Sequence, residues 1–217
     1  YQKEKNNPIG SWQMKHAEHT KFKLPEDLKK CIEFHGHLCP GLVYGYLVAK
    51  EAITLLKLKR SRDEEVVAIS ENDSCAVDAL QVMLGTSIGK GNLILKDYGK
   101  NAYTILNRSH KKAFRFSRKK YYRYGGEFGE EFSRLDQAIT SDTASDNEKW
   151  RHKMLKAKDL LSKPFSDVFF SKQVDIVIPP YAPLARSQAC AKCGEMTMST
   201  KMVRGENGKP ICIPCSG

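Results

Sequence analysis

The sequence of 217 residues has no apolar run that approaches the roughly 18 residues of a membrane-spanning helix, which excludes an integral membrane helix. Its first 23 residues are polar and lack the apolar centre of an export signal, so we expect no export signal. The chain shows no internal repeat apart from two short cysteine pairs. With 41% hydrophobic and 28% charged residues, its composition is that of a globular protein.

Acidic residues are scarcer than basic ones, with 25 Asp and Glu against 36 Lys and Arg, and the formal net charge is +11. The segment from Arg108 to Arg123 has eight Lys or Arg residues and no acid. This balance suits nucleic acid, an acidic partner or an anionic ligand. Cations mixed with tyrosines in this basic segment are compatible with a single-stranded nucleic-acid surface. We favour a solvated strand edge, where lysine prevents strand pairing between molecules.

Hydrophobic periodicity predicts a mixture of helices and strands. Helices are predicted over 25–33, 40–56, 75–84, 127–139 and 147–161. Strands are predicted over 66–70, 92–96, 102–106, 113–117 and 174–178. We expect Asp73 or Ser74 to cap the third helix at its start and Gly85 to end it. The strands over 92–96 and 102–106 flank a predicted turn over 97–100.

The chain is expected to have three parts. Residues 1–22 form a lead-in, 23–185 form one α+β domain with a helical extension, and 186–217 form a separate small module. The boundary before the module is indicated by Pro179, Pro180 and Pro183, which suggest a linker.

Seven cysteines are present, and four of them form two Cys-x-x-Cys pairs separated by 18 residues. The pairs are Cys190 with Cys193 and Cys212 with Cys215. Two thiolates three positions apart can hold one ion from a tight turn, and Gly194 permits the backbone conformation of that turn. Four thiolates are typical of a closed, tetrahedral Zn²⁺ site that supplies much of the folding free energy of a small module.

Two other interpretations of the cysteine pairs remain open. They could be redox dithiols, or they could hold iron as rubredoxin-type sites do. We prefer zinc because of the spacing of the pairs. Free thiols together with metal thiolates indicate a reducing environment, so we expect a cytoplasmic location.

The densest chemistry in the rest of the chain lies in the segment from His35 to Gly41, with the sequence His-Gly-His-Leu-Cys-Pro-Gly. His35 and His37 flank a glycine, and Cys39 precedes a helix predicted to begin at Pro40. The partial positive charge of a helix N-terminus lowers the pKa of a thiol, so we expect Cys39 to be activated.

A second thiol, Cys75, is predicted at another helix start, and Asp78 lies three residues later on the same helical face. The two helix starts could converge on one metal ion or anion. Taken singly, each cysteine could equally be a packed core residue, and each histidine a hydrogen-bonded polar group. Between the histidines we expect His37 to be the ligand because it is nearer to Cys39, with His35 in a supporting role.

Other candidate groups are interpreted as structural. Gly85, Gly89 and Gly91 surround Lys90 without the spacing of a Walker phosphate loop, so we expect them to form turns. His110 and His152 lie among charged residues, and we expect both to be solvated. His16 and His19 have helical spacing in the lead-in, and we do not interpret them as ligands.

Three motifs resemble the FmdE family, which is named after a component of formylmethanofuran dehydrogenase. The first is the segment from His35 to Gly41. The second runs from Cys75 to Gln81 as Cys-Ala-Val-Asp-Ala-Leu-Gln and continues through the stretch over 85–93. The third is Lys-Asp-Tyr-Gly-Lys over 96–100. The resemblance covers about residues 25–120, and members of the family often carry a C-terminal zinc module.

The resemblance implies an α+β fold, with a mixed-sheet core domain, flanking helices and, in this chain, a small C-terminal four-cysteine zinc module. It also implies a homodimer and a cavity lined by the two cysteine-containing segments. The metal-ligand candidates there are His35, His37, Cys39, Cys75 and Asp78. We therefore expect a second transition metal ion in the core, besides the Zn²⁺ of the module.

Three functions are compatible with this pattern. The first is a metal-binding accessory or redox-linked protein that acts with other protein subunits, as expected for a family related to methanogenesis. The second is a metal- or thiol-dependent enzyme on a small substrate. The third, which we do not favour, is a zinc-finger regulatory protein that binds nucleic acid with steep salt dependence. The resemblance does not make the chain a dehydrogenase, because nothing in it resembles a pterin site or a ferredoxin cluster sequence.

Overall fold

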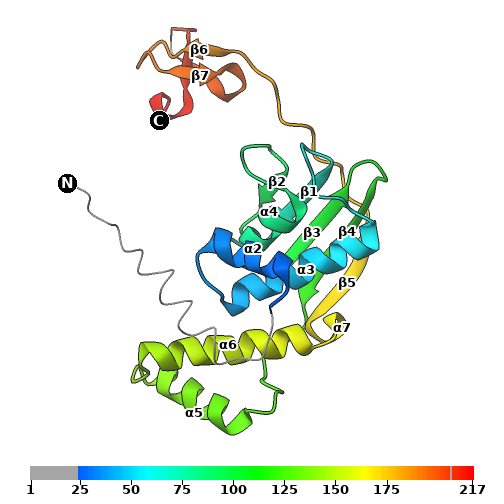
Figure 1. Ribbon diagram of the computed structural model, residues 1–217. Helices are drawn as coiled ribbons and strands as arrows, with labels where there is room; N and C mark the ends of the chain where they lie inside the picture. The colour runs from blue at the N-terminus through cyan, green and yellow to red at the C-terminus, as the bar shows by residue number, and fades with distance from the viewer. Residues whose placement is uncertain (1–23, 206) are drawn as a thin grey trace, which may run out of the picture.

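The computed structural model describes residues 24–205 and 207–217 (Figure 1). The predicted lead-in over 1–22, with His16 and His19, lies outside these residues. No helix among the described residues is long and apolar enough to cross a membrane.

The described residues form six α-helices and nine strands. The helices are α2 (Glu26–His35), α3 (Pro40–Leu56), α4 (Ala76–Leu84), α5 (Gly129–Thr140), α6 (Asp146–Ser162) and α7 (Phe165–Val168). The strands of the larger domain are β1 (Val66–Ser70), β2 (Leu93–Leu95), β3 (Ala102–Asn107), β4 (Lys112–Arg118) and β5 (Phe169–Val174). The C-terminal module contains β6 (Ser187–Ala189), β7 (Met196–Met198), β8 (Met202–Arg204) and β9 (Pro210–Cys212), with short 3₁₀ turns at Ser199–Lys201 and Ile213–Cys215.

Five strands form one sheet in the order β2-β1-β3-β4-β5. The β1–β2 pair is parallel, and the other three pairs are antiparallel. The sheet is therefore mixed, and the α+β prediction is confirmed. β2 and β3 do not pair with each other although they flank the predicted turn, because β1 lies between them.

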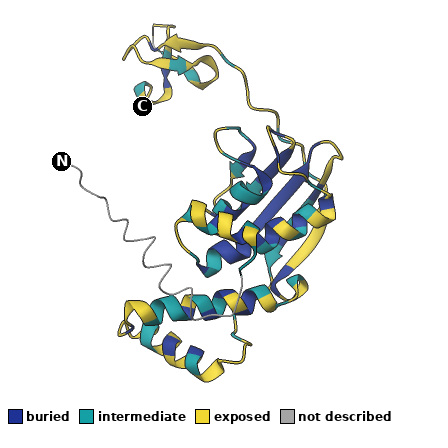
Figure 2. Cartoon of the chain, viewed as in Figure 1, coloured by how far each residue is buried: buried dark blue, intermediate teal, exposed yellow. Residues whose placement is uncertain are grey.

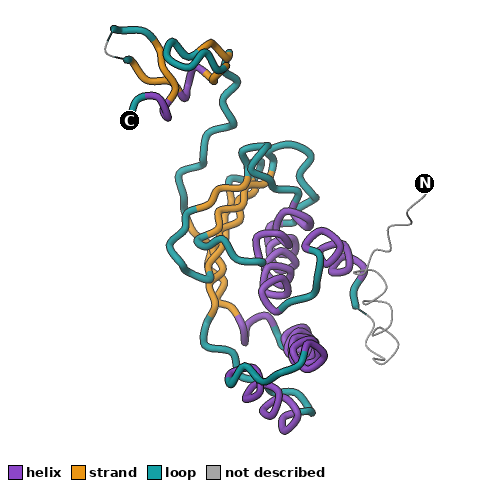
Figure 3. The backbone as a smooth tube through the Cα atoms, turned by 90° about the vertical axis from the view of Figure 1, so that its left-hand side faces the viewer, coloured by secondary structure: helices purple, strands orange, loops and turns teal. Residues whose placement is uncertain are grey.

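Helices α3 and α4 cover one face of this sheet (Figure 3). The core between the layers includes Tyr103, Ile105 and Phe116 from the strands, which are at most 1% exposed. Figure 2 shows the central strands of the sheet mainly in the colour of buried residues. The opposite face carries a smaller apolar cluster around Val67 and Leu106, and residues 174 and 176 pack against it. The stability of the larger domain therefore depends mainly on the face covered by helices.

Three predictions about the strands and helix caps are wrong. The last strand of the sheet is Phe169–Val174, so it ends where the predicted strand over 174–178 begins. β4 is an internal strand rather than an edge, because β5 pairs with it over six residues. Neither Asp73 nor Ser74 caps α4; the residue before this helix is Cys75, which makes no side-chain capping bond. Gly85 ends α4 in the left-handed conformation, as predicted.

Helices α5 and α6 form an antiparallel pair below the sheet in Figure 1. Ser145 caps α6 through a reciprocal pair of bonds with Glu148. His152 is buried, contrary to the prediction that it is solvated. Its ring stacks on Phe132 at a centroid distance of 4.5 Å, and its Nε2 atom lies 3.0 Å from Asp136 Oδ1. His152 thus belongs to the contact between the two helices.

The segment between the larger domain and the C-terminal module is attached to the domain by a buried ion pair. Arg108 contacts Glu64 at 3.4 Å and donates to the carbonyls of Pro179 and Pro180 at 2.6 and 3.2 Å. The backbone N–H of Ala182 donates to the Glu64 carboxylate at 3.0 Å. The predicted linker is therefore anchored over 179–182.

Candidate metal centres

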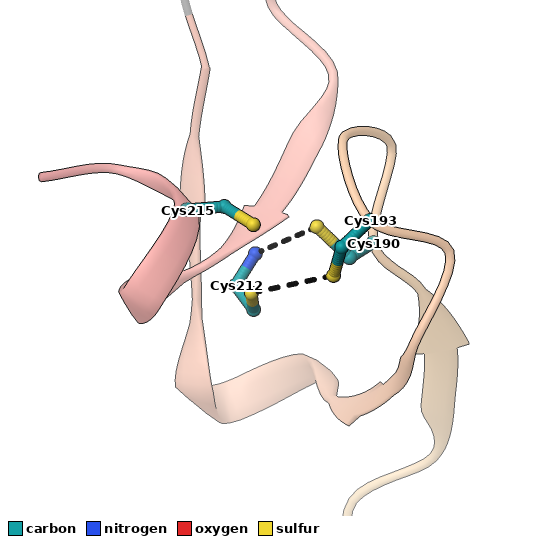
Figure 4. Close-up of side chains that lie close together, drawn as sticks. All are labelled: Cys190, Cys193, Cys212 and Cys215. Atoms are coloured by element: carbon teal, nitrogen blue, oxygen red, sulfur yellow. Dashed lines mark hydrogen bonds between the residues drawn. The ribbon is translucent and has the colours of Figure 1, made fainter.

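The C-terminal module brings Cys190, Cys193, Cys212 and Cys215 together (Figure 4). Their four sulfur atoms lie within 4.8 Å of one another. Gly194 has a φ of 79°, which is the left-handed conformation expected after the first cysteine pair. β6 pairs with β7 and β8 pairs with β9, so each cysteine pair is supported by its own small hairpin.

Backbone N–H groups point at the sulfur of Cys190. Those of Lys192 and Cys212 donate to it at 3.4 and 3.3 Å. Hydrogen bonds from the backbone N–H groups of Cys193 and Cys212 lower the pKa of Cys190 to about 6. Such bonds stabilise a thiolate, which is the protonation state that binds a metal.

A second group of metal-ligand residues lies in the larger domain. His35, Cys39 and Cys75 each offer one ligand atom, and these atoms lie within 4.8 Å of one another. The Nε2 atom of His35 is 3.7 Å from Cys39 Sγ. His35 is the last residue of α2, Cys39 directly precedes α3, and Cys75 directly precedes α4. Three helix ends therefore meet at this core cluster.

Two glycines on α3 allow α4 to approach closely enough for the two thiols to meet. A Cβ atom at Gly45 would lie 2.1 Å from the backbone oxygen of Ala76. A Cβ atom at Gly41 would lie 3.1 Å from Cys75 Cβ and 3.8 Å from Cys39 Sγ. Larger residues at Gly45 would force the two helices apart, and the sequence motif alone did not indicate this role.

Asp78 lies beside the core cluster and holds its histidine. Its Oδ2 atom is 2.7 Å from His35 Nδ1, and its Oδ1 atom accepts a bond from Gln81 Nε2 at 3.1 Å. A histidine held at one ring nitrogen by a carboxylate presents its other nitrogen to a metal in a fixed direction. Asp78 therefore orients His35 through the ring nitrogen that does not face Cys39. Gln81 in turn holds the carboxylate of Asp78.

His37 has a different position from the one expected. It is exposed and does not belong to the three-residue group. Its ring lies against that of His35 at a centroid distance of 4.6 Å. Partial removal of its ring from water, with the nearby charges of His35 and Lys153, lowers the pKa of His37. The preference for His37 over His35 is therefore not supported by the geometry.

The structure does not show the lowered thiol pKa that we expected for Cys39. Its sulfur accepts a bond from the Leu42 N–H at 3.4 Å, as a residue capping a helix would. Burial nevertheless raises the pKa of Cys39, and the neighbouring Cys75 thiol adds to this effect. A bound cation would act in the opposite direction, because a coordinating thiol is deprotonated.

The comparison with known proteins gives the family. Residues 34–170 match the family model described as FmdE, Molybdenum formylmethanofuran dehydrogenase operon. This chain belongs to the FmdE family. The matched region contains all five metal-ligand candidates of the core and ends inside β5. The resemblance seen in the sequence motifs is confirmed.

Two known proteins that are similar to this FmdE family member are informative. A protein from Archaeoglobus fulgidus, named a probable S-adenosyl-L-methionine-binding protein, is 30% identical over 209 residues, or 90% of this chain. The chain spans about half, 54%, of that relative's length. The crystal structure of an FmdE-like protein of the tungsten formylmethanofuran dehydrogenase type, from Syntrophus aciditrophicus, has the same fold, with a TM-score of 0.56 and 18% identity over 88% of this chain and 91% of that one.

In this FmdE chain, a groove of about 540 Å³ lies near the core cluster. Its lining includes Phe34, which precedes His35, and Gln81, which bonds to Asp78. The three clustered ligand residues are not among the lining residues that the structure describes. A groove of this volume is large enough for a small organic molecule.

The side chain of Lys90 in this FmdE chain forms hydrogen bonds to backbone carbonyls. Its Nζ atom donates to the carbonyl of Gly85, and to those of Ser61 and Arg62 at 3.3 and 3.4 Å. The structure therefore agrees with the interpretation of the neighbouring glycines as turns rather than a phosphate loop.

Proposed function

We propose that this chain is a metalloprotein of the FmdE family with two sites of different kinds. The C-terminal module holds Zn²⁺ in a closed site of four thiolates. The core domain holds one transition metal ion through His35, Cys39 and Cys75. The protein acts as a metal-dependent accessory to other protein subunits, in line with the operon named in the description of its family.

The observation that carries the proposal is the number and type of ligands in each group. Two thiols and one imidazole within 4.8 Å suit zinc and neighbouring transition metals. The three-residue set leaves a fourth tetrahedral position without a protein ligand, as catalytic zinc sites do, whereas four thiolates leave none. A bound ion in the core would supply a Lewis acid at that position.

The same observation favours a second candidate, a metal-dependent enzyme on a small substrate. Cys75 and His35 are only partly buried, so the core cluster is accessible from solvent. The groove near Gln81 offers space for a substrate. The exposed ring of His37 lies against that of His35 and could bind or orient an acidic substrate group.

The Archaeoglobus fulgidus relative suggests S-adenosyl-L-methionine as one ligand to test. The carboxylate group of S-adenosyl-L-methionine can bind a metal ion at one open position. Calorimetric titration of the metal-loaded and metal-free chain decides this point. If S-adenosyl-L-methionine binds only to the metal-loaded chain, it is assigned as a ligand of the core metal. If neither form of the chain binds it, this assignment is contradicted.

Metal analysis of purified variants tests the two-site proposal. The wild-type chain should contain two ions, and Cys75→Ser and Cys212→Ser should each contain one, because each variant loses one ligand of one site. Cys31→Ala is the matched control: it removes a buried thiol outside both groups, so it should keep both ions.

The open position can be tested separately with cobalt. In the Co²⁺-substituted Cys212→Ser chain, azide should change the visible absorption of the remaining core ion. In the Cys75→Ser chain, azide should leave the four-thiolate spectrum unchanged. One ion in the wild type, lost only in Cys212→Ser, would contradict the core metal site.

A further inference from the structure

A concavity of about 130 Å³ lies where the basic segment of the sequence ends. It is formed by the end of β4, the segment after it, and residues from α3, α6 and α7. Its lining includes Tyr44, Arg118, Lys120, Tyr122, Arg123 and Lys163. Neither candidate metal centre contributes a ligand residue to it.

The positive charge of this concavity is not neutralised from within. Among the residues that the structure describes, Arg118, Lys120 and Arg123 form no ion pair. The lining contains one carboxylate, Asp167, against four cations. The guanidinium of Arg118 lies over the ring of Tyr44 at 5.4 Å, which fixes its position.

A buried carboxylate behind the concavity orders its wall. Asp159 accepts bonds from the Tyr122 hydroxyl at 2.5 Å and the Gly125 N–H at 3.2 Å, and it pairs with Lys163. These contacts use both of its oxygens. Asp159 therefore holds Tyr122 and Lys163 in place, and it forms no ion pair with Arg118.

A further cation lies behind the same wall. Lys156 Nζ is 4.5 Å from the centre of the Tyr122 ring, on the helix that carries Asp159. Burial lowers the pKa of Lys156, and the charge of Arg118 contributes to this shift. Cations that are partly removed from water and close to each other gain most from an anion between or beside them.

We propose that this concavity binds the phosphate group of a small phosphorylated molecule. Its volume equals that of about four water molecules at roughly 30 Å³ each, which suits one phosphate group and excludes a whole nucleotide. Arg118 supplies a planar guanidinium, and Lys120 and Arg123 supply solvent-exposed charges. Tyr121, which is 84% exposed, offers a ring to the rest of the molecule.

The other arginines of the basic segment explain why a small ligand fits better than nucleic acid. Arg108 is used by Glu64 and the linker, and Arg115 forms two bonds to Glu71 at 2.7 and 2.9 Å. The segment therefore does not present a continuous row of free cations for a phosphodiester backbone. Of its cations that form no ion pair among the described residues, Arg118, Lys120 and Arg123 meet at the concavity, whereas Lys111 and Lys112 lie at the opposite end of β4.

Calorimetry on the metal-loaded full chain, at physiological ionic strength, tests the proposal. Inorganic phosphate and adenosine monophosphate should both bind, and adenosine should not. The double variant Lys120→Gln/Arg123→Gln should bind inorganic phosphate and adenosine monophosphate about tenfold or more weakly, since charge-assisted hydrogen bonds are lost. The matched control is Lys112→Gln/Lys172→Gln, which removes the same charge from two exposed residues outside the concavity and should change the affinity by less than about twofold.

The contrary outcomes are distinct from one another. Absence of phosphate and adenosine monophosphate binding at about 10 mM, a concentration that would reveal very weak sites, overturns the proposal. Equal weakening by both double variants shows general charge attraction and also overturns it. Tight binding of a single-stranded oligonucleotide without binding of either small phosphate would assign the concavity to nucleic acid instead.

Discussion

The Nδ1 atom of His35 lies 2.7 Å from the Oδ2 atom of Asp78, and the Nε2 atom of the same ring faces the sulfur of Cys39 at 3.7 Å. The imidazole is therefore oriented from behind by a carboxylate on another helix. Gln81 holds the other carboxylate oxygen. This chain of contacts connects α4 to the end of α2 through the proposed core metal site.

Replacement of Asp78 by alanine should lower the affinity of the core for its metal by about 10- to 100-fold, the usual effect of losing a group that orients a metal-binding histidine. Competition with a chromophoric chelator measures this affinity. Glu33→Ala, an exposed acid on α2, is the control and should have the wild-type value. Equal affinities for Asp78→Ala and the wild type would contradict the orienting role.

A Gly45→Ala substitution should destabilise the larger domain by at least about 2 kcal/mol, because the new methyl group would overlap the backbone of Ala76. Urea unfolding gives the change in free energy of unfolding. Gly89→Ala is a suitable comparison, since a Cβ there meets nothing within 4 Å. If both substitutions cost the same, the close approach of α3 and α4 does not limit stability.

Loss of one thiolate from the C-terminal module should unfold that module alone. In Cys215→Ser, amide resonances over 187–216 should lose their dispersion while those of the larger domain remain, because a module this small depends on its metal for folding. Two-dimensional NMR provides the measurement, and Ser216→Ala is the neighbouring control. A module that keeps its dispersed resonances in a strong chelator would show that no metal is needed.

Acidification should weaken the contact between α5 and α6. Burial lowers the pKa of His152, although Asp136 opposes the shift. The folded state therefore binds this proton less readily than the unfolded state, whose pKa is about 6.5. The contribution to stability is present above that pH and declines as pH falls below it. His152→Phe keeps the stack on Phe132 without titrating, so amide exchange in α5 should depend less on pH in this variant than in the wild type.

A homodimer is expected from the family resemblance. Light scattering of the full chain at micromolar concentration should give twice the chain mass. A mass equal to one chain under these conditions would contradict the expectation. The measurement should be repeated on Cys212→Ser, which separates association through the larger domain from association through the zinc module.

Sequence patterns located the elements whose signals are local. Pro40 begins α3, and the strand over 66–70 has the predicted bounds, because a proline at the first helical position and a run of β-branched residues act within a few residues. The strand predicted over 174–178 is wrong because β5 ends at Val174, and Ile176 packs on the sheet's second face without continuing that strand. Its pairing with β4 depends on residues more than 50 positions away.

The core cluster also combines features that the sequence predicts with features that depend on long-range packing. The motif identified the candidate residues, but the choice between two histidines depended on where α2 ends. The helix extends to His35, and Gly36 turns the chain there with a φ of 89°. His35 is thereby held on a helix beside Asp78, whereas His37 follows the turn. The position of α4 beside this helix end could not be derived from periodicity, because it depends on contacts between distant segments.

The anchored linker limits how far the zinc module can travel. Ala182 is bound to Glu64, and only the four residues over 183–186 separate it from β6. Fully extended, the five Cα–Cα steps from residue 182 to 187 span at most about 18 Å. A partner held by the module would therefore remain at high effective concentration near the start of β1 and the end of β3, where Glu64 and Arg108 hold the linker. Breaking the Glu64–Arg108 pair would lengthen the tether and dilute that partner without altering either metal site.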